Sequence, residues 1–252
     1  ENVMSNDKIV VERPGKKIYR DGDKLVKLFD KGYSKADILN EALNQARVEE
    51  TDLNIPKITE VSVVDGCWSI TMDYIDGTTL EQLMNDHPEK IDEYLDIFVD
   101  IQKNVQSKRV PLLNMLIEKM HRKISAADID ATTRYDLHTR LNGMKRHIKL
   151  CHGDFNPSNI IITADGTPYI IDWAHATQGN AAADAARTYL LFYLQGKNEI
   201  GDKYLKLFCK KTDTAIQYVQ KWIPIVAASR LVKAPEDERE FLMRWIDVVD
   251  YE

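Results

Sequence analysis

A short β-like segment, residues 150–173, interrupts a long helical stretch and constrains this chain most. It spells LCHGDFNPSNIIITADGTPYIIDW. Two apolar runs, Ile160–Thr163 and Pro168–Ile171, flank Asp165-Gly166, and a dipeptide of this type between apolar runs is a strong hairpin signal. The segment therefore predicts a β-hairpin whose open end carries polar side chains.

The expected register places two polar side chains opposite each other. With Asp165 and Gly166 as the two central turn residues, Asn159 faces Asp172, and opposed residues on antiparallel strands share one face with Cβ atoms roughly 5 Å apart. Carboxylate and amide oxygens are ligands that Mg²⁺ prefers. Asp154, five residues before Asn159, can lie near such an ion and orient a hydroxyl nucleophile. The alternative is an ordinary hairpin with polar ends.

Two motifs give the segment a family resemblance. His152-Gly153-Asp154 to Asn159 spells HGDxxxxN, and Ile171-Asp172-Trp173 spells IDW. The chain resembles, over almost its whole length, the aminoglycoside phosphotransferase and choline kinase branch of the protein-kinase-like superfamily. Eukaryotic protein kinases usually carry HRD and DFG instead. Gly153 and Trp173 therefore favour the branch that acts on small molecules.

The resemblance implies roles for individual residues. Asp154 is expected to be the catalytic base or hydroxyl-orienting residue, and Asn159 and Asp172 are expected to hold Mg²⁺. His152 is expected to brace the loop by hydrogen bonding. Asp184, in AAADAAR, is expected to be a scaffold residue beneath the loop.

The first 75 residues suggest a small sheet with one helix. Ser34 is placed to cap a helix that ends near Glu50. Five β-rich runs surround this helix in the sequence: Ile9–Val11, Lys16–Tyr19, Lys24–Phe29, Ile58–Val64 and Trp68–Tyr74. This β-β-β-α-β-β order matches the kinase N-lobe by resemblance. We expect an α+β, bilobal protein-kinase-like fold, with an N-lobe over residues 1–75 that binds nucleotide.

The remainder, residues 76–252, predicts a larger, mainly helical C-lobe that holds the catalytic loop, metal site and acceptor site. Thr78 and Thr79 precede Glu81 and Gln82 in capping-box spacing and open a short helix. Further helices are predicted over Ile91–Val105, Leu112–Lys123, Thr133–Lys149, 180–195, 201–220 and 236–249.

Lys27 is the candidate phosphate ligand. It lies in KLVKLF between Val26 and Leu28, so it points off the face that these apolar residues share. A lysine here is either a solvated edge residue or a phosphate ligand, and the resemblance favours a contact with the α- and β-phosphates. Glu41 is the expected carboxylate partner of Lys27. Glu49 and Glu50 compete for this role but lie near the helix end.

The nucleotide-binding loops depart from common patterns. GxGxxG and GxxxxGK[ST] are both absent, so a P-loop enzyme of the usual kind is excluded. The turn that covers the phosphates must lie near Gly15, and both ATP and GTP remain open as donors. The segment Met72–Leu80 resembles the family's hinge, where backbone groups of Asp73, Tyr74 and Ile75 could hydrogen-bond an adenine edge.

The resulting functional expectation is transfer of the γ-phosphoryl group of ATP or GTP to a hydroxyl of an aminoglycoside, choline-like alcohol or sugar. The late acidic run beginning at Glu236 favours a cationic acceptor or is simply a solvated helix face. Two alternatives remain. One is a catalytically weak nucleotide-binding regulatory module. The other is a protein Ser/Thr kinase, against which the short stretch between Asp172 and Asp184 argues.

Composition excludes several other classes. The 34 basic and 40 acidic residues give a net charge of −6, which argues against a nucleic-acid partner. Cys67, Cys151 and Cys209 are too few and too widely spaced for a disulfide framework or a zinc site. No signal pattern and no membrane-spanning apolar stretch is present. We expect a cytoplasmic monomer or dimer without a membrane partner.

Overall fold

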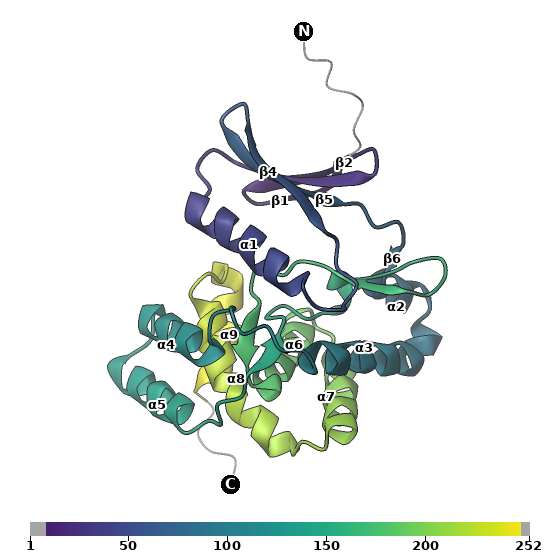
Figure 1. The fold of residues 1–252 in the computed structure, drawn as a ribbon. Helices are drawn as coiled ribbons and strands as arrows, with labels where there is room; N and C mark the ends of the chain where they lie inside the picture. Colours follow the sequence, from purple (N-terminus) through teal and green to yellow (C-terminus); the bar gives the residue numbers. More distant parts are fainter. Residues whose placement is uncertain (1–8, 248–252) are drawn as a thin grey trace. The chain divides into compact units, whose positions relative to one another are not determined.

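The computed structural model describes residues 9–247, in which the chain forms two compact units (Figure 1). The sheet unit contains the chain up to Gln82 together with Ser158–His175, and the helical unit contains Leu83–Pro157 and the chain from Ala176 onward. This division differs from a single boundary at residue 75. The difference arises because the predicted hairpin pairs with residues 78–79 and so lies in the sheet unit.

The sheet unit is built on a five-stranded antiparallel sheet of order β1-β2-β3-β5-β4. Its strands are β1 (Ile9–Arg13), β2 (Lys16–Asp21), β3 (Lys24–Phe29), β4 (Ile58–Val64) and β5 (Cys67–Asp73). Helix α1 (Lys35–Val48) packs on this sheet (Figure 1). The Ser34 side chain accepts a hydrogen bond from the N–H of Asp37, which confirms the predicted cap. Phe29, Ile38 and Ile70 are buried between helix and sheet.

A second, three-stranded sheet of order β6-β8-β9 completes the sheet unit. It consists of β6 (Thr78–Thr79), β8 (Ile160–Ile162) and β9 (Pro168–Ile170), with the 3₁₀ turn η2 (Pro157–Asn159) just before β8 and α2 (Leu80–Asp86) just after β6. The predicted hairpin is therefore present. Gly77 must be glycine, because a Cβ there would lie 2.5 Å from the carbonyl oxygen of Ile162.

The expected hairpin register is wrong by one residue. Ile160 pairs with Ile170, and the N–H of Thr163 donates to the carbonyl of Thr167, so three residues rather than two form the tip. Asp165 closes this tip by accepting a hydrogen bond from the N–H of Thr167. As a result Asn159 lies opposite Ile171, not opposite Asp172, and its carbonyl accepts from the N–H of Ile171 at 2.9 Å.

The helical unit surrounds a two-stranded sheet. Its helices are η1 (Pro88–Lys90), α3 (Ile91–Gln106), α4 (Leu116–Ala126), α5 (Ala131–Asn142), α6 (Ala181–Leu194), α7 (Asn198–Thr212), α8 (Ile216–Leu231) and α9 (Glu236–Ile246). Strand β7 (Lys149–Cys151) pairs with β10 (Thr177–Gly179). Helices α6 and α8 pack closely, and Phe98 stacks on Phe155 in the core. No helix within residues 9–247 combines the length and apolar character needed to cross a bilayer.

Three predicted helices are wrong in extent. The helix expected over Leu112–Lys123 begins at Leu116 and continues to Ala126. The helix expected over 201–220 is two helices, because Asp213 adopts a left-handed φ of 51° and ends α7. Aspartate tolerates this conformation better than most residues. The helix expected over 133–149 stops at Asn142, and Lys149 already belongs to β7.

Candidate active site

Lys27 is the centre of a buried ion-pair cluster in the sheet unit. Its side chain on β3 is 2% exposed, and its Nζ lies 2.9 Å from Oε1 of Glu41 on α1 and 2.6 Å from Oδ1 of Asp172. Burial opposes the charge of Lys27, but the two carboxylates outweigh it and raise its pKa. The predicted Lys27–Glu41 pair is therefore confirmed, and the solvated edge residue is excluded.

Asp172 follows β9 in an unusual backbone conformation. Its φ is 62°, in the left-handed region that non-glycine residues occupy at a cost of about 1–3 kcal/mol. Burial opposes ionisation of Asp172, but Lys27 dominates and lowers its pKa to about 2, with Arg13 adding to the effect. The carboxylate is therefore ionised at neutral pH. A strained, charged residue at the end of a strand is typical of a functional site.

Two basic residues beside Gly15 also belong to this cluster. Nη1 of Arg13 lies 3.8 Å from Oδ2 of Asp172. Burial lowers the pKa of Lys16, while Glu41 and Asp172 act on it in the opposite direction. Lys16 lies within the turn expected near Gly15, whereas Arg13 is not expected from the sequence, although both belong to the basic run RPGKK. Gly15 itself has a φ of 78° and forms the β1–β2 turn as expected.

The donor chemistry of the expected magnesium site fits the ion. Asp172 supplies an ionised carboxylate, and Asn159, which ends η2, supplies a buried amide side chain. Both side chains belong to the sheet unit. Within residues 9–247 no three His, Cys, Asp or Glu side chains gather into a metal cluster. This donor set suits Mg²⁺, which commonly binds one or two carboxylates and completes its shell with water and phosphate oxygens.

The loop that carries Asp154 lies in the helical unit and is held from α6. Asp184 accepts hydrogen bonds from the N–H groups of His152 and Gly153, both at 2.8 Å. Thr188 donates to the carbonyl of Phe155 at 2.6 Å. Burial raises the pKa of Asp184, although His152 and the two N–H groups oppose that effect. Asp184 is therefore the scaffold residue that the sequence suggested.

His152 braces the same loop from within. Its side chain is fully buried, and its Nδ1 accepts a hydrogen bond from the N–H of Asp154 at 3.1 Å. The amide of Asn156 donates to the carbonyl of Asp154 at 3.1 Å. The loop is thus rigidly built around Asp154. Because Asp154 belongs to the helical unit and Asp172 to the sheet unit, their expected proximity stays a prediction.

The structure reduces the number of hinge N–H groups that are available to an adenine edge. The N–H of Asp73 donates to the carbonyl of Lys57 at 3.0 Å, and the N–H of Tyr74 donates to the carbonyl of Asp23 at 2.9 Å. Both donors are therefore occupied within the sheet unit. Of the three expected residues, Ile75 is the better candidate to donate to an adenine edge.

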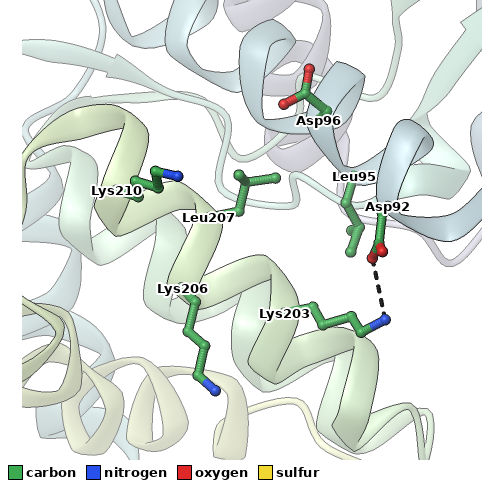
Figure 2. A pocket seen from close by; sticks show the side chains of 7 residues that line it. All are labelled: Asp92, Leu95, Asp96, Lys203, Lys206, Leu207 and Lys210. Atoms are coloured by element: carbon green, nitrogen blue, oxygen red, sulfur yellow. Dashed lines mark hydrogen bonds and ion pairs between the residues drawn. The ribbon is translucent and has the colours of Figure 1, made fainter.

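A shallow groove between α3 and α7 contains none of the expected site residues (Figure 2). It is lined by Asp92, Leu95, Asp96, Lys203, Lys206, Leu207 and Lys210. Lys203 pairs with Asp92 at 3.2 Å, as Figure 2 shows. Since its charged side chains are surface groups and one pair already neutralises itself, the groove offers no catalytic arrangement.

Comparisons with known proteins identify a family and a shared fold. The profile of the phosphotransferase enzyme family matches residues 5–222. No curated protein sequence matches the chain significantly.

Several solved structures share the fold. A thermostable mutant of aminoglycoside phosphotransferase APH(4)-Ia with ADP and hygromycin B has a TM-score of 0.70 at 11% identity, over 96% of this chain and 92% of that chain. A second variant of that thermostable mutant, in complex with AMP-PNP and hygromycin B, has a TM-score of 0.70 at 14% identity, over the same shares. A choline/ethanolamine kinase family protein from Mesorhizobium loti has a TM-score of 0.63 at 11% identity, over 97% and 89%.

At these identities the likeness to solved structures shows the fold, and the expected α+β, protein-kinase-like fold is confirmed. The family profile covers most of the chain and includes the HGDxxxxN and IDW motifs. On that match, this chain belongs to the phosphotransferase enzyme family.

Proposed function

We propose that this protein transfers the γ-phosphoryl group of ATP to a hydroxyl group of a small molecule. The observation that carries the proposal is the Lys27 cluster, in which Nζ lies 2.9 Å from Glu41 and 2.6 Å from Asp172. Kinase-type phosphoryl transfer needs a strand lysine fixed by a helix carboxylate, and a carboxylate placed to hold metal. Family membership supports the reaction class.

The donor side is assigned to the sheet unit. Lys27 binds and neutralises the phosphates, and Arg13 and Lys16 add positive charge around the same region. Asp172 and Asn159 would hold Mg²⁺, which when bound would neutralise charge on the phosphate oxygens. The solved relatives crystallised with ADP and AMP-PNP support ATP as donor, with GTP as the alternative.

The acceptor side is assigned to the loop around Asp154. Its carboxylate orients the acceptor hydroxyl and takes the proton as the oxygen attacks the γ-phosphorus. A new bond forms between the acceptor oxygen and phosphorus, and the bond between phosphorus and the bridging oxygen of ADP breaks. The proton then passes from Asp154 to solvent. The loop hydrogen bonds to Asp184 and Thr188 fix the carboxylate for this step.

The experiment is acceptor-dependent ADP release, measured for the wild type and for Asp154→Asn. We expect kcat to fall about 10²–10⁴-fold in the variant, while the Kd for ATP changes little because Asp154 does not bind the phosphates. Lys206→Met, an exposed change on α7, is the matched control with unchanged kcat. An unchanged kcat in Asp154→Asn would contradict the assignment. Nucleotide binding without turnover of any acceptor would favour the regulatory module.

A further inference from the structure

We propose that the acceptor carries an anionic group, a carboxylate or a phosphate, and that Arg187 on α6 binds it next to the loop of Asp154. This inference rests on the proposed kinase function and names its substrate class. All of its residues lie in the helical unit.

The position of Arg187 follows from the way α6 holds the loop. Residues three and four apart lie on one face of a helix. Asp184 and Thr188 are four apart, and both hydrogen-bond the loop, at residues 152–153 and at Phe155. Arg187 comes three residues after Asp184 and directly before Thr188, so it extends from the side of α6 that contacts the loop.

One donor of the Arg187 guanidinium has no hydrogen-bond partner among the described residues. Its Nε is buried, and among the described residues no acceptor lies within hydrogen-bonding distance of that atom. A buried donor left unpaired costs free energy, so a ligand that supplies an acceptor to this atom would bind favourably. Among charged groups, Asp154 attracts Arg187 most strongly and Arg230 repels it. Arg187 therefore interacts electrostatically with Asp154, the expected catalytic carboxylate.

Charges of both signs act on Arg187: Asp154, Asp184 and Glu238 attract it, and Arg230 repels it. Lys119 on α4 lies close enough to interact with Arg187, and Arg122 and Lys123 act on Lys119 in turn. Two of the three carboxylates are engaged by other groups: Asp184 accepts two backbone hydrogen bonds, and Glu238 is paired with Arg230. Nε of Arg187 has no acceptor among the described residues, and a guanidinium forms its strongest hydrogen bonds with carboxylate or phosphate oxygens, so the site favours an anionic ligand.

The structure gives no support to the alternative of a cationic acceptor bound by the late acidic run. Glu238 is paired with Arg230 through two contacts of 2.9 and 3.0 Å, so it is not available to a ligand as a free charge. Glu236 and Asp237 are exposed in the first turn of α9, as solvated residues are. The guanidinium fork of Arg187 matches the planar geometry of a carboxylate or the oxygens of a phosphate.

The first experiment measures anion binding without catalysis. Inorganic phosphate is titrated calorimetrically into protein saturated with AMP-PNP and Mg²⁺, so that the nucleotide site is filled. We expect binding to the wild type that weakens about tenfold or more in Arg187→Met, is partly restored in Arg187→Lys and is unchanged in Lys206→Met. Equal binding to Arg187→Met, or none to the wild type, would overturn the proposal. Thermal unfolding of each variant confirms that it is folded.

The second experiment compares small hydroxyl compounds that differ in charge. Glycerate and glycerol 3-phosphate separate the carboxylate from the phosphate, glycerol is neutral, and ethanolamine and hygromycin B are cationic. We expect the highest kcat/KM for an anionic compound, and a KM for it that rises about tenfold or more in Arg187→Met while the KM for glycerol stays the same. A preference for cations, or an equal loss for every acceptor, would contradict the inference.

The two experiments separate this inference from the proposed function. If no compound supports ADP release but phosphate still binds through Arg187, the kinase assignment fails and the anion site stands. If an uncharged or cationic acceptor turns over and phosphate binding does not depend on Arg187, the kinase assignment stands and the anion site fails.

Discussion

The ammonium nitrogen of Lys27 lies 2.6 Å from Oδ1 of Asp172, although the two residues are 145 positions apart in the chain. The same nitrogen lies 2.9 Å from Glu41, so β3, α1 and the end of β9 meet at one buried charge. Breaking a buried charge cluster by removing one member leaves an uncompensated charge, which is strongly unfavourable. Lys27 therefore has a structural role as well as its expected role toward phosphates.

The first prediction concerns Lys27 and Glu41 as a unit. Lys27→Met removes a cation from the phosphates and should lower kcat/KM for ATP strongly. Glu41→Gln should cost less, because Asp172 still holds the lysine. In a double-mutant cycle the double variant should be little worse than Lys27→Met alone. If the two losses in kcat/KM simply add, the pair does not act together on the nucleotide.

The second prediction concerns the two expected metal ligands. Asp172 carries the charge, so Asp172→Asn should abolish the Mg²⁺ dependence of ADP binding, whereas Asn159→Ala should only weaken it. The measurement is a titration of Mg²⁺ into protein at a fixed ADP concentration, and calorimetry detects the binding. Glu49→Gln is the control for the loss of a carboxylate, because Glu49 accepts a backbone hydrogen bond from Ile58 and is not an expected metal ligand. Equal Mg²⁺ affinity in Asp172→Asn and the wild type would exclude Asp172 as a ligand.

The third prediction concerns the support of the catalytic loop. In Asp184→Asn one side-chain oxygen becomes an NH₂ group, which cannot accept from the N–H of His152 or Gly153. One of two buried donors is then unpaired, so we expect about 1–3 kcal/mol lower stability. We also expect a reduced kcat with an unchanged Kd for ATP. Thr188→Val removes the hydrogen bond to the carbonyl of Phe155, and it should likewise reduce kcat without changing the Kd for ATP. A raised Kd for ATP with an unaltered kcat would mean that these variants act on nucleotide binding and not on the catalytic loop.

Much of the sheet unit could be predicted because its signals are local. Alternating side chains placed Lys27 on a strand, and the resemblance suggested Glu41 of the following helix as its partner, a pairing that the structure confirms. The hairpin was predicted from Asp165-Gly166, but that dipeptide also occurs in longer tips. Its register depended on whether Asp165 accepts from Thr167, which only the folded loop reveals.

Features that depend on contacts between residues far apart in the chain could not be predicted from the sequence. The left-handed φ of Asp172 occurs at a residue other than glycine, and no neighbouring residue signals it. The break at Asp213 has neither glycine nor proline to mark it. Arg187 was missed because one arginine in a helix usually faces solvent. The sequence did contain one signal: Arg187 lies one turn after Asp184 in the otherwise mainly small and apolar run AAADAARTYLL.

The last prediction follows from the protonation of Lys119. Burial lowers the pKa of this residue to about 8, and the positive charges of Arg187, Lys123 and Arg122 contribute, while Asp184 opposes them. In the unfolded chain a lysine titrates near its ordinary value of about 10.4. Between these two values the unfolded state binds more protons than the folded state, so stability rises with pH across this window.

Lys119→Met removes this dependence. The difference in unfolding free energy between wild type and Lys119→Met should therefore shift in favour of the wild type between pH 8 and pH 10, by about 2 kcal/mol. Urea unfolding at several pH values measures it, and Lys206→Met, an exposed lysine, should show no such shift. A pH-independent difference would mean that Lys119 keeps an ordinary pKa. Because the folded protein loses this positive charge above about pH 8, phosphate should also bind more weakly at pH 9.5 than at pH 7, and Lys119→Met should weaken this pH dependence.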